Sequence, residues 1–160
     1  KVVNNKEISN LCINLDSELL KYEKEFFKKH KDSISNICGY NIKWGEYKKN
    51  IELSNKLNSL IEEYIDDLIF DGKDILVTIE LLNKIKYKKY FFTKVNETFC
   101  KIFFNKFNIK NQNMLYTKDN NTIVNILSEN EISLSESIII NNNNFKEINS
   151  LLLIIINETK

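Results

Sequence analysis

The sequence predicts an all-α fold, a single-domain helical bundle of five to seven helices. Apolar residues recur at intervals of three and four over most of the chain, which is the spacing of an amphipathic helix. The chain has no proline to interrupt a helix and only three glycines. The 160 residues fit one domain. The fold of residues 117–143 is the least determined, and short strands are an open alternative there.

Two helices are expected in the N-terminal part. The first begins at about Lys6 and has apolar residues at i, i+3, i+4 and i+7, namely Ile8, Leu11, Cys12 and Leu15. Asp16 or Ser17 can cap the second by accepting a hydrogen bond from a free N–H. Its buried stripe, interrupted by Glu23 and ending at His30, consists of Leu19, Leu20, Phe26 and Phe27.

A break and then the strongest helical pattern follow. Residues 32–47 have poor periodicity and hold two of the three glycines and the sole Trp44, which predicts a loop with a hydrophobic plug. From about Glu46 to Phe70 a long helix is expected, with Gly72 ending it. Its opposite face is acidic and carries Glu62, Glu63, Asp66 and Asp67.

The second half of the chain is predicted as helices joined by polar loops. Asp74 caps a helix that includes Ile75 to Leu82, for which a buried strand is the alternative that length and capping disfavour. The basic stretch from Lys84 to Lys94 leads into a helix rich in phenylalanine that ends near Phe107. Residues 111–121 are expected to form a loop, and residues 122–127 either a strand or a helical turn. Asn144 caps the last helix.

Composition restricts the classes of function. The net charge of +1 argues against a nucleic-acid binder that depends on a large positive field. The sequence contains no arginine, so guanidinium contacts to phosphate or guanine are impossible. The excess of Lys, Asn and Ile is typical of an AT-rich genome, as in some protozoan parasites and large DNA viruses. The longest apolar run, Leu151 to Ile156, is too short for a membrane span, and we expect a cytoplasmic protein.

No group of residues predicts catalysis, a metal or a cofactor. His30 is the sole histidine, and Cys38 is its nearest nucleophilic neighbour in the sequence. The three cysteines, Cys12, Cys38 and Cys100, form no CxxC pair, which predicts free thiols without a zinc site. Glycine is too scarce for a loop that cradles phosphate. We therefore expect no catalytic, metal-binding or cofactor-binding residues.

Two charged segments have competing interpretations. The acidic residues between 62 and 67 favour a solvated helix face over a cation site, because the alternating pattern of a calcium loop is absent. Residues 84–94 interleave lysines with Tyr87, Tyr90, Phe91 and Phe92. Such a pattern suits a nucleic-acid or membrane surface, but a helix with aromatic residues inside and lysines outside gives the same pattern and is preferred.

Residues 19–82 resemble the BART domain, the helical module of proteins that bind Arf-like small GTPases. Residues 26–30, Phe-Phe-Lys-Lys-His, are similar to the end of that family's second helix. Residues 60–67, Leu-Ile-Glu-Glu-Tyr-Ile-Asp-Asp, look like a stretch of its third helix. The resemblance implies a helical groove that takes the apolar helix and switch surface of a GTP-loaded GTPase. The residues expected to bind the partner are Leu57, Leu60, Ile61, Tyr64, Ile65 and Leu68.

We therefore expect a non-enzymatic protein-interaction module, with a small GTPase as the leading partner class. A second interpretation rests on Trp44-Gly45, which resembles part of the Asn-Trp-Gly element of Bcl-type helical bundles, including poxviral copies. That resemblance implies capture of an amphipathic partner helix. A structural subunit of a larger protein assembly is the third interpretation.

Overall fold

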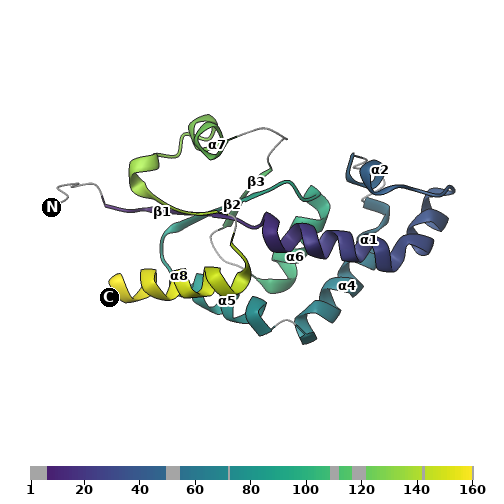
Figure 1. Ribbon diagram of the computed structural model, residues 1–160, viewed down its shortest axis with the longest axis horizontal. Coiled ribbons are helices and arrows are strands. Elements are labelled where there is room, and N and C mark those ends of the chain that lie inside the picture. The colour runs from purple at the N-terminus through teal and green to yellow at the C-terminus, as the bar shows by residue number, and fades with distance from the viewer. Residues whose placement is uncertain are drawn as a thin grey trace.

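Helices surround a four-stranded parallel sheet in the computed structural model of the chain (Figure 1). The structure describes residues 7–49, 55–71, 73–108, 112–116, 122–141 and 143–159. In chain order the elements are β1 (Asn10–Asn14), α1 (Asp16–Cys38), α2 (Trp44–Lys49), α4 (Asn58–Asp71), α5 (Lys73–Lys84), β2 (Lys88–Thr93), α6 (Glu97–Phe107), β3 (Gln112–Tyr116), α7 (Ile123–Glu129), a 3-10 turn (Leu134–Glu136), β4 (Ser137–Ile140) and α8 (Phe145–Glu158).

The sheet has the strand order β3-β2-β1-β4, and every neighbouring pair is parallel. Cys12 of the central strand β1 pairs with Tyr90 of β2 on one side and with Ile139 of β4 on the other. Leu11, Cys12 and Ile13 are at most 1% exposed. A parallel sheet needs crossover connections, and the helices of these connections cover its faces.

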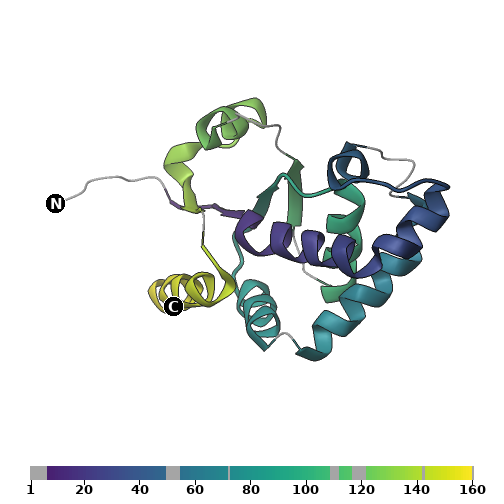
Figure 2. The ribbon, with the colours of Figure 1, turned by 45° about the vertical axis from the view of Figure 1, so that its right-hand side comes forward.

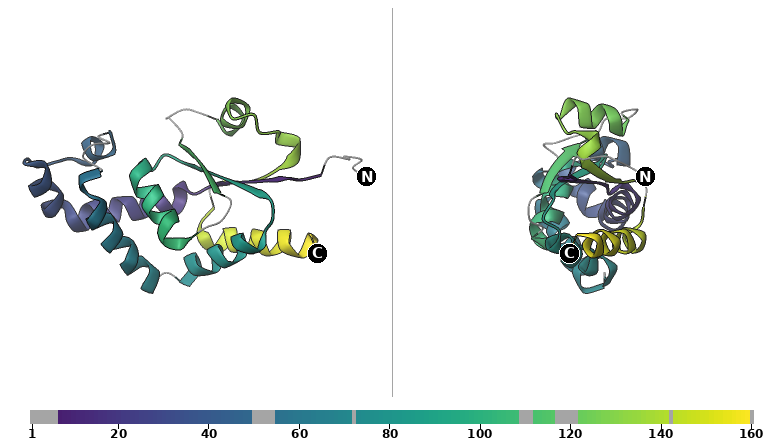
Figure 3. Two further views of the ribbon diagram at one scale, coloured as in Figure 1. Left: turned by 180° about the vertical axis from the view of Figure 1, so that it is seen from behind. Right: turned by 90° about the vertical axis from the view of Figure 1, so that its left-hand side faces the viewer.

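The two faces of the sheet are covered unequally. Leu11, Phe91 and Ile140 belong to the main core, which also takes in buried residues of α1, α4, α5, α6 and α8. Cys12 and Phe92 belong to a smaller cluster completed by α7 and Ile132. An end view of the sheet shows α7 on one side and α5 and α8 on the other (Figure 3). The alternation of side chains along each strand thus divides the apolar residues between two cores.

The chain is mostly helical, as predicted, but the all-α class is wrong because the sequence reading missed the sheet. The expected N-terminal helix is strand β1, the expected loop at residues 111–121 contains β3, and the basic stretch contains β2. The open segment 117–143 contains β4, in agreement with the alternative of short strands there. A strand buried on both faces lacks the polar–apolar alternation that identifies a strand, so a short apolar run fits either element.

For two of the predicted helices the structure confirms the buried residues or the capping residue. Helix α1 buries Leu19, Phe26 and Phe27 as expected, and Glu23 is also fully buried. It continues through the predicted break to Cys38 and ends at Gly39, whose φ of 80° is the left-handed conformation that glycine favours. Asn144 caps α8 through a complete capping box with Glu147. The single helix expected from about Glu46 to Phe70 is wrong, because Glu46 lies in α2, which ends at Lys49, and α4 begins only at Asn58. Residues 50–54 and Gly72 lie outside the described residues.

Helices α1, α2 and α4 extend beyond the end of the sheet and form a helical lobe (Figure 2). Aromatic side chains connect this lobe to α6. The ring of Phe26 lies 6.2 Å from Tyr47, 5.5 Å from Tyr64 and 6.0 Å from Phe99, measured between ring centroids. Offset and tilted contacts of this kind add to the free energy gained from burial. The lobe and the sheet therefore share one aromatic core.

Helix α8 provides a matched pair of leucines for testing the packing. Leu152 is fully buried, and its neighbour Leu153 is 48% exposed. We expect Leu152→Ala to lower the free energy of unfolding by about 2–5 kcal/mol, because it leaves a cavity in the main core. Leu153→Ala should change it by about 0.5 kcal/mol or less. Urea denaturation followed by circular dichroism measures both, and equal effects would contradict the placement of α8.

Candidate functional site at the carboxyl edge of the sheet

The strands β1, β2 and β4 end at one edge of the sheet, here called the carboxyl edge. From β1 the chain adds β2 and then β3 on one side, and it afterwards crosses back to place β4 on the other side of β1. The carboxyl edge between β1 and β4 is therefore a topological switch point. In open parallel sheets, ligands bind in the crevice that forms at such a point. The helical lobe follows β1 directly and lies on this side of the sheet (Figure 2).

Asp16 joins the ends of β1 and β2. Its Oδ1 atom accepts hydrogen bonds from Thr93 Oγ1 and from the backbone N–H of Lys94, both at 2.8 Å. Thr93 Oγ1 in turn accepts a hydrogen bond from the backbone N–H of Val95 at 3.0 Å. Hydrogen bonds to a carboxylate are stronger than those between neutral groups. Asp16 therefore fixes the conformation of the turn that leaves β2.

The N-terminus of α1 has a different environment from those of the other helices that begin at this edge. Asn96 and Asn144 cap α6 and α8 by accepting hydrogen bonds from their first amides. At α1 the N-cap residue is Leu15, which provides no side-chain hydrogen bond. Asn14 Oδ1 accepts a hydrogen bond from the backbone N–H of Asp16 at 2.8 Å. Because the N-terminus of a helix carries a partial positive charge, this end of α1 can interact with an anion.

Two further acidic residues of α1 hold neighbouring segments in place. Glu23 is fully buried, and its Oε2 atom accepts a hydrogen bond from the backbone N–H of Asn96 at 2.8 Å. Glu18 Oε1 accepts one from the backbone N–H of Phe145 at 3.4 Å. Helix α1 is thereby bonded to the first residues of both α6 and α8. The polar residues of the carboxyl edge thus form one connected framework.

His30 and Cys38 are not brought together by the structure. Both lie on α1, eight residues apart, which corresponds to about 12 Å along the helix axis. His30 interrupts the helix with non-helical backbone angles and packs on Phe26 at 5.1 Å between ring centroids. Burial lowers the pKa of His30, with a smaller effect of Lys29, and burial raises the pKa of Cys38. Both shifts favour the neutral forms of these side chains.

The acidic residues of α4 are exposed, as the interpretation of a solvated helix face predicts, whereas the basic stretch contains strand β2 instead of a helix and buries Lys89. Asp67 forms an ion pair with Lys29 at 3.2 Å, and Asp66 forms one with Lys106 at 3.0 Å, on exposed surfaces. Within residues 84–94, Phe91 and Phe92 are fully buried on opposite faces of the sheet. The aromatic residues and the lysines of this stretch therefore do not form one continuous surface.

The residues expected to bind a partner lie mostly inside the protein. Leu57, Ile61 and Ile65 are fully buried and Tyr64 is 5% exposed, all within the main core. Leu60 and Leu68 are partly buried and pack against that core. The apolar stripe of α4 thus contacts the rest of the chain rather than an open groove. Trp44 likewise packs on Phe27 and Tyr47, and a Cβ atom at Gly45 would meet nothing within 4 Å.

No protein-family model, curated protein or solved structure matches this chain. Among the helices that the structure describes, none is long and apolar enough to cross a membrane. Within the same described residues, no group of three His, Cys, Asp or Glu side chains is placed to hold a metal ion. The candidate site therefore rests on the geometry of the carboxyl edge.

The prediction that Asp16 or Ser17 caps α1 is wrong, because the N-cap residue is Leu15 and the Asp16 carboxylate bonds to Thr93 and Lys94. The signal that was available is that polar residues directly follow short apolar runs, at Asn14 and again at Thr93. In a parallel sheet such residues meet at one edge. Both runs also fit helical spacing, and helices predict no such common edge.

A double-mutant cycle tests the bond between Asp16 and Thr93. We expect Asp16→Ala and Thr93→Val to show a coupling energy of roughly 1–2 kcal/mol in the free energy of unfolding, because each variant removes one partner of a charge-assisted hydrogen bond. Asp16→Ala combined with Thr159→Val is the control, since Thr159 ends α8 far from this edge, and its coupling should be below about 0.5 kcal/mol. Equal coupling in the two cycles would contradict the bond.

Proposed function

We propose that the protein is a non-catalytic binding domain that holds a phosphorylated, hydroxyl-bearing small molecule at the carboxyl edge of its sheet. The observation that carries this proposal is the N-terminus of α1, which follows the central strand at the switch point and has no side-chain cap. The N–H of Asp16 bonds to Asn14 Oδ1, and those of Glu18 and Leu19 bond to the carbonyl oxygen of Leu15, so a phosphate at this position would accept a hydrogen bond from the backbone N–H of Ser17.

The side chains around this position support the same class of ligand. Asp16 is a hydrogen-bond acceptor for hydroxyl groups, and Asn14 offers an amide. The exposed Lys94, whose backbone N–H bonds to Asp16, supplies a positive charge beside the same turn. An amide is neither a nucleophile nor an acid at neutral pH, so Asn14 at the end of β1 suits binding rather than catalysis.

Nuclear magnetic resonance titration tests the proposal with glucose 6-phosphate, glucose and inorganic phosphate. We expect glucose 6-phosphate to bind most tightly, with chemical-shift changes in the amides of Asp16 to Leu19, because phosphate and hydroxyls are then recognised together. Lys94→Ala should weaken binding by roughly 3- to 10-fold, since one charge contact is lost.

Lys88→Ala is the matched control, because Lys88 is exposed at the other end of the same strand. It should change the dissociation constant by less than about 2-fold. If no amide of residues 16–19 shifts with glucose 6-phosphate, or if the two lysine variants weaken binding equally, the proposed site is wrong.

A protein-interaction module with a small GTPase as partner is the second candidate function. Its support is the apolar surface on the neighbouring helices α5 and α8, where Leu76, Val77, Leu153 and Ile154 are between 44% and 52% exposed. The two helices are joined by bonds from Thr78 and Asn149. Exposed apolar side chains on adjacent elements are typical of protein-binding surfaces. This surface replaces the stripe of α4 as the place where a partner would bind.

Pull-down of Arf-like GTPases in their GTP-bound and GDP-bound states tests this second candidate. We expect binding in the GTP state only, and a loss of at least about 10-fold in affinity for Ile154→Asp, because a charge would enter an apolar contact. Val124→Asp is the control, since Val124 is 60% exposed on α7 at the opposite face of the sheet. Absent binding, or equal binding in both states, would contradict the candidate.

A further inference from the structure

A pocket opens at the opposite edge of the sheet, where the strands begin. It has a volume of about 360 Å³, which lies within the range of small-molecule sites. The end of α5, the first residues before β2 and the end of α8 form its walls. Figure 1 places the end of α8 at this edge, away from the helical lobe and the carboxyl edge. The residues that line the pocket are Lys84, Ile85, Lys86, Tyr87, Ile156 and Thr159.

The lining of the pocket is apolar inside and positively charged at the rim. Ile85 is buried, while Ile156 and Tyr87 are partly buried. Lys84 and Lys86 are exposed, and Lys84 has one long contact of 3.6 Å with Glu80. No ion pair involving Lys86 occurs among the described residues. The pocket therefore combines an apolar surface with positive charges at its opening.

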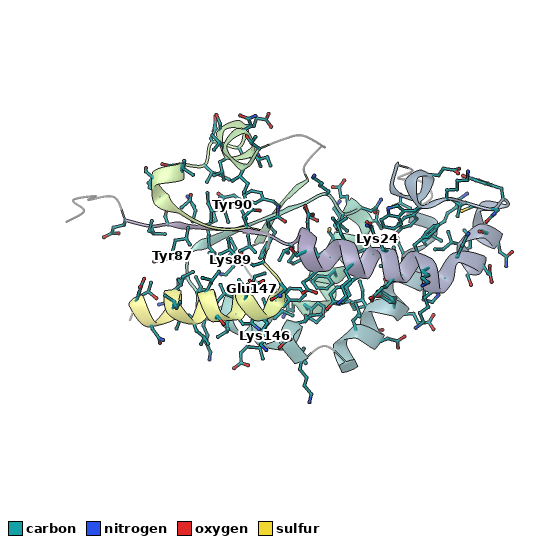
Figure 4. The ribbon with its side chains drawn as sticks, in the orientation of Figure 1. Lys24, Tyr87, Lys89, Tyr90, Lys146 and Glu147 are labelled. Atoms are coloured by element: carbon teal, nitrogen blue, oxygen red, sulfur yellow. The ribbon has the colours of Figure 1, made fainter. Side chains whose placement is uncertain are left out.

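A buried lysine lies directly behind the wall of this pocket. Lys89 is 1% exposed, and its Nζ atom donates hydrogen bonds to the carbonyl oxygens of Ile85 at 2.6 Å and of Tyr87 at 3.4 Å. Figure 4 shows Tyr87 and Lys89 between the sheet and α8, while Tyr90 lies on the side of α7. In the part of the chain that the structure describes, Lys89 forms no ion pair with a carboxylate.

Burying a positive charge without an opposite charge is costly. The carbonyl groups at the end of α5 offset part of this cost, because the C-terminus of a helix carries a partial negative charge. Burial still lowers the pKa of Lys89, which means that the charged form is less stable there than in water. An anion bound in the pocket would compensate this charge across a wall formed by two residues.

We propose that this pocket binds a small amphipathic anion, a carboxylate or phosphate monoester attached to an apolar body. The apolar body packs against Ile85, Ile156 and the ring of Tyr87. The anionic group lies between the side chains of Lys84 and Lys86, close to the buried ammonium of Lys89. This site lies at the opposite edge of the sheet from the carboxyl edge. A negative result at one site therefore does not contradict the proposal for the other.

Isothermal titration calorimetry with ligands of equal chain length tests the proposal on the full chain. The ligands are octanoate, octyl phosphate, 1-octanol and octylammonium. We expect the two anions to bind with dissociation constants below about 1 mM, and octanol and octylammonium to bind at least about 10-fold more weakly. Amide chemical shifts of Ile85 to Tyr87 and of Ile156 should change on addition of octanoate.

Charge reversal at one exposed lysine provides the matched comparison. Lys86→Glu should weaken octanoate binding by about 10-fold, because Lys86 lines the pocket, whereas Lys88→Glu should weaken it by less than about 2-fold. Lys88 is exposed two residues away and instead lies over the ring of Tyr90, at 5.3 Å from its centroid. Octanol binding as tightly as octanoate, equal effects of the two variants, or no shift in the pocket amides would each overturn the proposal.

Discussion

The burial of strand β1 between two other strands is the constraint on which the rest of the structure depends. Its three central residues are almost completely inaccessible to water, so their backbone N–H and C=O groups must bond to neighbouring strands. β2 begins about 74 residues later in the chain and β4 later still, and both pair with β1 in parallel. The helices between the strands can reach the right positions only by crossing over the sheet, and this requirement creates the main core.

The same constraint brings the polar residues together. Since all four strands are parallel, the polar residues that follow β1, β2 and β4 meet at one edge, and the helices after these strands begin there. Asp16 is central because it bonds to the turn after β2 and also begins α1. The opposite edge collects the ends of α5 and α8, with their partial negative charges and the lysines near them. At that edge the positive charge for a ligand comes from the lysine side chains alone, whereas at the carboxyl edge it comes from Lys94 and the N-terminus of α1.

The candidate site could be predicted only in part from the sequence. Asn144 caps α8, as its place before an apolar stripe predicts. The predicted cap of α1, Asp16 or Ser17, is wrong, because the N-cap residue is Leu15 and the Asp16 carboxylate bonds to the turn after β2. The contact of Asp16 with Thr93, 77 residues apart in the chain, has no local signature. The sequence also does not predict that Lys89 is buried, because a lysine within a basic stretch is ordinarily exposed. Its burial follows from its position in strand β2, which the pairing of the strands fixes.

The sequence by itself determined that most of the chain is helical, the buried stripe of α1, the Asn144 cap of α8 and the absence of guanidinium chemistry. Helical periodicity and capping act over a few residues, so they can be identified without knowing the fold. The tertiary structure decided that Leu11 to Ile13 form a strand and not a helix, and that the stripe of α4 faces the core and not a partner. An apolar run of three residues fits either element, and only the hydrogen bonds to β2 and β4 select the extended form.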